Sequence, residues 1–108
     1  MRFWGIVAES RGDPERLRTV LAGLSRAEVY AFQDVFLEFS AEVRDLVGSG
    51  HTEDGADDVA DWVVSQGAAA YAAVLAGGPV GAPLDPVGLG HVAYEVYFER
   101  FGVALDLM

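Results

Sequence analysis

Apolar residues along this 108-residue chain recur at intervals of three and four, the spacing that places them on one face of an α-helix. No stretch alternates apolar and polar residues as a half-buried β-strand does. The pattern is clearest in the middle of the chain, where one stripe contains Val29, Phe32, Phe36, Phe39, Val43 and Leu46. The chain is therefore predicted to be all-α.

Turn and capping residues divide this pattern into five helices. Asp13 and Pro14 suit the N-cap and the first position of a helix, and Ser25 and Glu28 have the spacing of a capping box. Glycine-rich segments at residues 48–50 and 77–78 are predicted to end two further helices. The five predicted helices cover residues 3–10, 14 to about 24, the capping box to about 47, about 54 to 75, and about 88 to 101.

The five helices are expected to form a single domain, since the chain is of ordinary domain length and has no internal repeat. The glycine-rich connection between the third and fourth helices is short. Short connections favour antiparallel neighbours, so these two helices are predicted to pack antiparallel, with the last helix closing the core.

The chain is strongly acidic, with a net charge of −10 and no lysine. The imbalance lies mostly in the second half, where residues 51–108 contain nine acids and a single arginine, Arg100. Such a surface repels nucleic-acid phosphates and anionic membranes, and it attracts a basic protein or peptide. Solubility alone also explains a net charge far from zero. We therefore expect no nucleic acid and no membrane among the partners.

Several short motifs resemble the small bacterial DUF4240 family. They are the pair Phe3 and Trp4, the pair Phe32 and Phe36, and the segments at residues 52–55, 62–67 and 92–97. The chain departs from the family's pattern at Ala56, Val59 and Ala60, where the family carries aromatic residues and an arginine. The family has no known function, so the resemblance implies a helical fold and no activity.

Acidic residues gather at the start of the predicted fourth helix. Four of them share one helical face at positions i, i+3, i+4 and i+7, and the predicted partner-binding residues of this region are Glu53, Asp54, Asp57, Asp58, Asp61 and Trp62. Carboxylates on adjacent turns can hold a divalent cation, but no known metal-binding motif accompanies these. Acids also complement the dipole at a helix N-terminus. We predict a docking face here, and no metal or cofactor.

The two histidines are the candidates for proton transfer or ligand binding. His51 precedes Glu53 and Asp54, whose charges favour the protonated imidazole. His91 lies beside Tyr94 at the start of the predicted last helix. Structural roles in a turn or at a helix start are the simpler interpretation of both histidines. No serine lies in a nucleophile elbow, and there is no cysteine.

These observations favour a non-enzymatic accessory protein that presents its acidic helix to a basic protein or peptide. The alternative is a small helical enzyme or ligand-binding protein that uses His51 with the neighbouring acids. A third hypothesis is a homodimer formed through an apolar helix face. No signal peptide or membrane span is recognised, and the cytoplasm is the expected location.

Overall fold

A computed structural model describes residues 2–47, 53–83 and 86–106, with residues 53 and 54 described by their backbone alone. These residues form an all-helical structure, as predicted, and no strand occurs among them. The helices are α1 (Phe3–Ser10), α2 (Pro14–Ala22), α3 (Arg26–Val47), α4 (Glu53–Ser65), α5 (Ala68–Leu75) and α6 (Val92–Phe101).

The capping signals of the sequence are confirmed in the structure. Asp13 accepts a hydrogen bond from the backbone N–H of Glu15 at 3.0 Å, ahead of Pro14 at the first position of α2. Ser25 accepts from the N–H of Glu28 at 3.2 Å, and Glu28 accepts from the N–H of Ser25 at 3.0 Å. These bonds satisfy amides that a helix start otherwise leaves without partners.

The single helix predicted from residue 54 to residue 75 is wrong, because the chain forms two helices there. α4 ends at Ser65 and α5 begins at Ala68, and Gly67 between them has φ 111° and ψ 179°. This backbone conformation is open to glycine and strained for residues with a Cβ. The apolar spacing alone did not reveal the break, because alanines follow Gly67 and continue the helical pattern.

The start of the last helix also differs from the prediction. α6 begins at Val92 rather than near Gly88, and His91 occupies its N-cap position. The residues before it, Gly88 to Gly90, form a loop that lies against α4. The amides of Leu89 and Gly90 donate to Ser65 and Asp61 of α4, so this loop is held by α4 before the chain enters α6.

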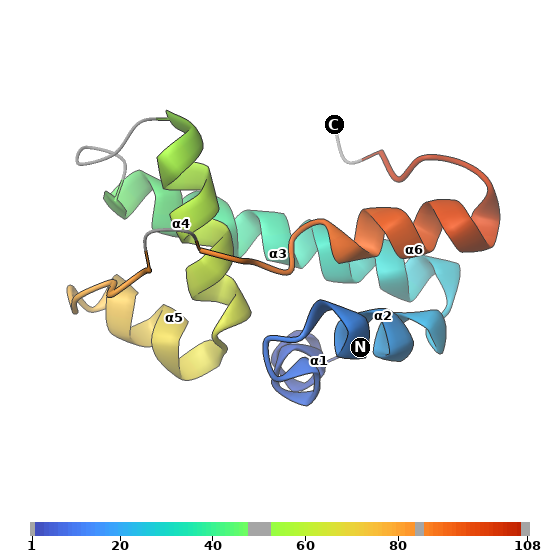
Figure 1. Cartoon of the computed structure of the whole chain (residues 1–108), viewed down its shortest axis with the longest axis horizontal. Coiled ribbons are helices and arrows are strands. Elements are labelled where there is room, and N and C mark those ends of the chain that lie inside the picture. Colours follow the sequence, from blue (N-terminus) through green and yellow to red (C-terminus); the bar gives the residue numbers. More distant parts are fainter. Residues whose placement is uncertain (1, 48–52, 84–85, 107–108) are drawn as a thin grey trace.

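The helices are arranged around α3, which spans the long axis of the molecule (Figure 1). α6 lies alongside the first half of α3 and runs in the opposite direction, with α2 packed beside it. α4 packs on the second half of α3 but runs across it (Figure 1), so the predicted antiparallel pairing of these helices is wrong. α6 takes the antiparallel position instead.

Aromatic rings join α1 to the middle of the molecule. Phe3 stacks on Phe32 with ring centroids 5.0 Å apart, and Trp4 stacks on Phe39 at 5.0 Å. Tyr71 of α5 closes the cluster, 4.7 Å from the ring of Phe39. The stripe predicted for α3 is buried along most of its length, but its last member, Leu46, is 54% exposed.

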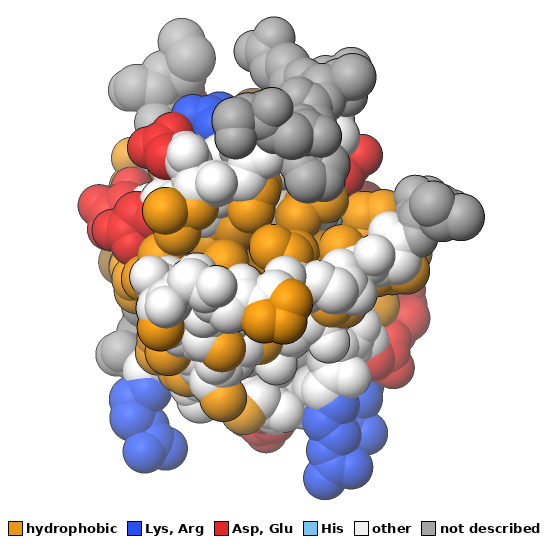
Figure 2. Space-filling model, turned by 90° about the vertical axis from the view of Figure 1, so that its left-hand side faces the viewer, with side chains coloured by type: hydrophobic (Ala, Val, Ile, Leu, Met, Phe, Trp, Pro, Cys, Tyr) orange, Lys and Arg blue, Asp and Glu red, His pale blue; other side chains and the backbone are white. Residues whose placement is uncertain are grey.

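The surface is mixed in character. On the end of the molecule where α5 lies, apolar side chains gather near the centre and acidic side chains lie toward the margins (Figure 2). Within the described part of the chain, none of the helices combines the length and the apolar character needed to span a bilayer.

The break at Gly67 can be tested by Gly67→Ala. Because φ is 111° there, we expect the alanine to lower the free energy of unfolding by about 1–3 kcal/mol. Gly23→Ala is the matched control, since Gly23 has φ −88° and a Cβ added to it would make an ordinary contact 3.5 Å from the Val20 carbonyl. The control should change stability by less than about 1 kcal/mol. Urea unfolding measures both, and unchanged stability with increased helical ellipticity in Gly67→Ala would indicate one continuous helix.

Candidate functional site

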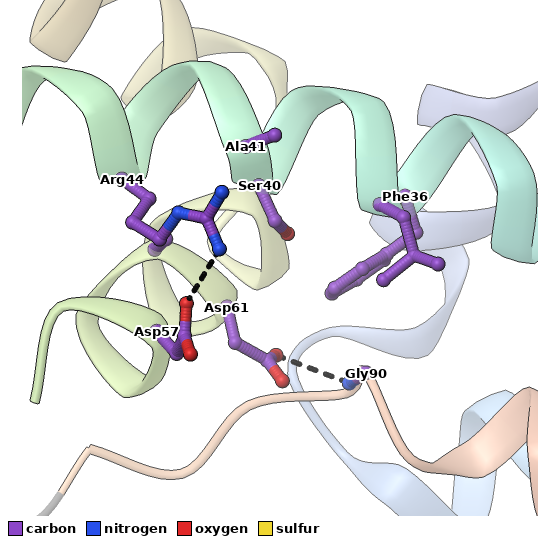
Figure 3. Close-up of a pocket in the computed structure, with 9 residues that line it drawn as sticks. Phe36, Ser40, Ala41, Arg44, Asp57, Asp61 and Gly90 are labelled. Atoms are coloured by element: carbon purple, nitrogen blue, oxygen red, sulfur yellow. Dashed lines mark hydrogen bonds and ion pairs between the residues drawn. The ribbon is translucent and has the colours of Figure 1, made fainter. Parts of the chain in front are cut away.

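A pocket of about 300 Å³ lies where α4 crosses α3, beside the loop that precedes α6 (Figure 3). It contains both apolar and charged side chains, which is typical of sites that bind an amphipathic group. Its lining residues are Phe36, Leu37, Ser40, Ala41, Arg44, Asp57, Ala60, Asp61 and Gly90.

Asp61 connects the floor of the pocket to the loop. Its Oδ1 accepts a hydrogen bond from the N–H of Gly90 at 3.0 Å, and the Ser65 hydroxyl lies 3.3 Å from the same oxygen. Ser65, one turn further along α4, donates to the backbone carbonyl of Asp61 at 2.7 Å and accepts from the N–H of Leu89 at 2.9 Å. Two side chains of one helix face thus hold two successive amides of the loop.

The glycines of the loop allow this close approach. A Cβ on Gly88 would lie 1.9 Å from Asp61 Oδ1, and a Cβ on Gly90 would lie 2.3 Å from Asp61 Oδ2. Both distances are far below van der Waals contact, so a larger residue would push the loop away from the carboxylate. The spacing of Gly88 and Gly90 therefore matches the position of Asp61.

Burial raises the pKa of the Asp61 carboxyl, because a charged carboxylate is poorly solvated beneath the loop. The hydrogen bonds from Gly90 and Ser65 and the nearby His91 oppose this effect without cancelling it. Asp61 thus differs from the other acids predicted for the docking face. It acts within the fold, and it also lines the pocket.

The other acids of the predicted face lie further out. Asp57 forms an exposed ion pair with Arg44 of α3, with 3.3 Å between Asp57 Oδ1 and Arg44 Nη1 (Figure 3). Asp58 is exposed, and Trp62 is half-buried against the core. The side chains of Glu53 and Asp54 lie outside the described residues.

The candidates for proton transfer are only partly placed. His91 is exposed in the turn before α6, close enough to Asp61 to influence its pKa. Tyr94, in the first turn of α6, is 37% exposed. His51 lies outside the described residues, so its predicted interaction with Glu53 and Asp54 is not tested.

Two polar residues of α3 escaped the sequence analysis. Among the described residues, Ser40 Oγ and Gln33 Oε1 are buried polar atoms without a hydrogen-bond partner. Gln33 is fully buried, and its Nε2 donates to the carbonyl of Gly90 at 3.0 Å. The signal was present, since Gln33 and Ser40 are seven residues apart and flank the apolar stripe of α3.

A metal site is a separate question. In the part of the chain that the structure describes, no group of three or more histidine, aspartate or glutamate side chains could hold a metal ion. This statement covers the acidic residues at the start of α4 only in part, because the side chains of Glu53 and Asp54 are not described.

Comparisons with known proteins identify no relative. No family model matches the chain, and no curated protein or solved structure matches it either. The resemblance to DUF4240 is therefore neither supported nor contradicted, and the site must be interpreted from its own geometry.

The role of Asp61 can be tested by comparing Asp61→Asn with Asp61→Ala. Asparagine keeps an oxygen for the N–H of Gly90, whereas alanine leaves that amide without its partner. We expect alanine to be less stable than asparagine by about 1–3 kcal/mol, as measured by urea unfolding. Equal stability of the two variants would contradict a structural role for this hydrogen bond.

The same variants predict a pH dependence. The pKa of Asp61 is raised in the folded state, so the carboxyl's contribution to stability is complete below its unfolded value of 3.8 and is lost as the pH rises through the folded pKa. The free energy of unfolding of the wild type, relative to Asp61→Asn, should therefore decrease as the pH rises above 3.8 and through the raised pKa of the folded state. A constant difference over this range would show that burial does not affect this carboxyl.

Proposed function

We propose that this chain is a non-enzymatic interaction protein that binds a basic protein or peptide at the crossing of α3 and α4. The observation that carries the proposal is that the arginines and the carboxylates have different roles in the fold. Several arginines are engaged within the fold, whereas many carboxylates face outward. Both helices that cross at the pocket, α3 and α4, carry such outward-facing carboxylates.

The arginines illustrate this use of charge. Arg18 of α2 pairs with Glu95 and with Glu99, 3.0 Å away on α6. Arg100 donates to the carbonyls of Leu21 and Leu24 at 3.2 and 2.5 Å. These cations stabilise the contact between α2 and α6, and their engagement there reduces their ability to offset acids elsewhere.

Arg26 is engaged in the same way. Its Nε donates to the Tyr97 hydroxyl at 2.6 Å, and its guanidinium lies over the Tyr97 and Phe101 rings at 5.2 and 5.6 Å. Cation–π contact of this kind favours a fixed guanidinium. Beside the pocket, Arg44 pairs with Asp57 and is the one arginine among the lining residues.

Exposed acids occur on both helices of the crossing. Glu38 and Asp45 of α3 follow the lining residues Leu37 and Arg44, and each lies about 100° further around the helix, on its solvent-exposed side. Asp57 and Asp58 provide the border on α4. A basic segment lying across the crossing would meet carboxylates from both helices, which favours rapid, salt-sensitive association.

The second candidate function is small-ligand binding in the pocket, favoured by the half-buried carboxyl of Asp61. An enzyme that uses His51 with Glu53 and Asp54 stays a prediction, as do homodimer formation and a cytoplasmic location. Membership of DUF4240 is likewise a proposal that rests on the short motifs alone.

The docking proposal predicts a position-specific effect of charge reversal. Asp57→Arg with Asp58→Arg should slow association with a basic partner by about tenfold or more at low salt, and the effect should diminish at high salt. Glu9→Arg with Glu15→Arg is the matched control on α1 and α2. Each pair replaces two negative charges by two positive ones, a change of four that takes the net charge from −10 to −6.

Partners are first captured from a native lysate at low and high salt and identified by mass spectrometry. Association rates of a purified partner are then measured by surface plasmon resonance for the wild type and both variants. Equal slowing in the two variants would indicate a general charge effect and would contradict docking at α4. Unchanged rates in both would remove electrostatic docking altogether.

A further inference from the structure

Carboxylates and one buried hydroxyl line the pocket between α3 and α4. Asp61 and Asp57 contribute the carboxylates, and Arg44, which donates to Asp57, contributes N–H donors. Ser40 contributes a hydroxyl that has no hydrogen-bond partner among the described residues. Figure 3 shows the Ser40 side chain directed toward the space between Asp61 and Phe36. A buried hydroxyl without a partner is unfavourable in an isolated fold, so a bound group that satisfies it would restore a lost hydrogen bond.

Gln33 adds a second acceptor of the same kind. Its Nε2 donates to the Gly90 carbonyl, which accepts only, so the side-chain amide cannot be turned over without losing that bond. Its Oε1 therefore remains the atom without a partner, in a residue that is 0% exposed. Gly90 itself lines the pocket, so this acceptor lies close behind the pocket wall.

The remaining walls are apolar. Phe36 and Leu37 of α3 line one side, together with Ala41, and Ala60 of α4 lies opposite. A ligand that matches these walls has an aliphatic stem and a head rich in donors. A primary ammonium has three donors and no acceptor, and lysine carries it on four methylenes.

We propose that the pocket binds the side chain of a lysine from the basic partner, with its ammonium at Asp61 and Ser40 and its methylenes against Phe36 and Leu37. This inference rests on the proposed function, since it names the residue that a basic partner inserts. Arg44 competes for the same acidic border, because its guanidinium occupies Asp57 in the free protein. We expect the ammonium of the entering lysine to pass the Arg44–Asp57 ion pair and to bind the Asp61 carboxylate.

The raised pKa of Asp61 agrees with this assignment. Burial removes part of the hydration of the Asp61 carboxyl and disfavours its charged form. A cation that binds beside it favours the charged form again. Among the described residues, Arg44 shares the pocket lining with Asp61 and His91 lies close enough to influence its pKa, and both side chains are exposed to solvent. Binding of a lysine at this position should therefore weaken as the pH falls and Asp61 is protonated.

The probe is Nα-acetyl-lysine methylamide, titrated into the ¹⁵N-labelled full chain and followed by amide chemical shifts. For a ligand of this size we expect a dissociation constant on the order of 1 mM, with the largest shifts at Gly90 and around Ser40. The Nζ-acetylated form of the probe has no charge and should produce no saturable shift. Equal binding of the two forms would overturn the inference.

Ser40→Ala separates ligand binding from a structural role. The hydroxyl has no hydrogen-bond partner in the described part of the chain, so its loss should leave the unfolding midpoint unchanged or slightly higher while weakening the probe severalfold. Ser10→Ala, whose hydroxyl donates to the Val7 carbonyl at 2.6 Å away from the pocket, is the control and should leave binding unchanged. Undiminished binding in Ser40→Ala would contradict the assignment.

Two further variants complete the test. Asp61→Asn replaces a carboxylate oxygen by an N–H donor and should weaken the probe about tenfold or more. Arg44→Gln frees Asp57 and should strengthen binding of the probe severalfold. Weaker binding of the probe to this variant would count against the competing role of Arg44.

The lysine pocket and the proposed function can fail separately. If the probe binds saturably but no basic partner docks, the proposed function alone is refuted. Docking that is unaffected by Ser40→Ala and Asp61→Asn would refute the lysine pocket alone.

Discussion

The hydrogen bond between Asp61 and the N–H of Gly90 is the constraint on which the site depends. It joins α4 to a loop that is distant in sequence, and that loop leads directly into α6. Gly88 and Gly90 make the approach sterically possible, and Ser65 extends the contact to the next amide. Without this contact the crossing of α3 and α4 would lack the third wall of its pocket.

The same contact explains why a carboxylate lies so deep in an acidic protein. A surface acid is kept in water at little cost, but Asp61 loses much of its hydration and is partly compensated by amide donors. Compensation is incomplete, and Ser40 Oγ and Gln33 Oε1 have no hydrogen-bond partner among the described residues. The partly desolvated carboxylate beside the Ser40 hydroxyl is the physical basis for proposing a cationic group at this position.

Charge is distributed between fold and surface in a consistent way. Arg18, Arg26 and Arg100 fix α2, α3 and α6 to one another through carboxylates, an aromatic hydroxyl and helix-end carbonyls. Toward the other end of α3, Arg44 pairs with Asp57 of α4, and Glu42 accepts a hydrogen bond from the Tyr71 hydroxyl of α5. Net charge alone describes an acidic chain, whereas the structure shows which arginines are engaged between helices and that Asp57 and Asp58 are exposed on α4.

The sequence by itself determined the elements governed by local chemistry. The caps at Asp13 and at Ser25 with Glu28 were predictable, because the atoms that bond are only two or three residues apart. The helical class and most of the buried stripe of α3 followed from spacing, which depends only on helix geometry. The acidic composition likewise predicted a class of partner, and that prediction remains to be tested.

The tertiary structure alone decided which acids belong together and where the helices break. Asp57, Asp58 and Asp61 share a face by spacing, yet only Asp61 meets Gly90, because that contact depends on a loop 29 residues away. The break at Gly67 and the crossing of α4 over α3 are also long-range outcomes. They arise from how the helices pack around one core, and helical periodicity carries no information about the direction in which two helices meet.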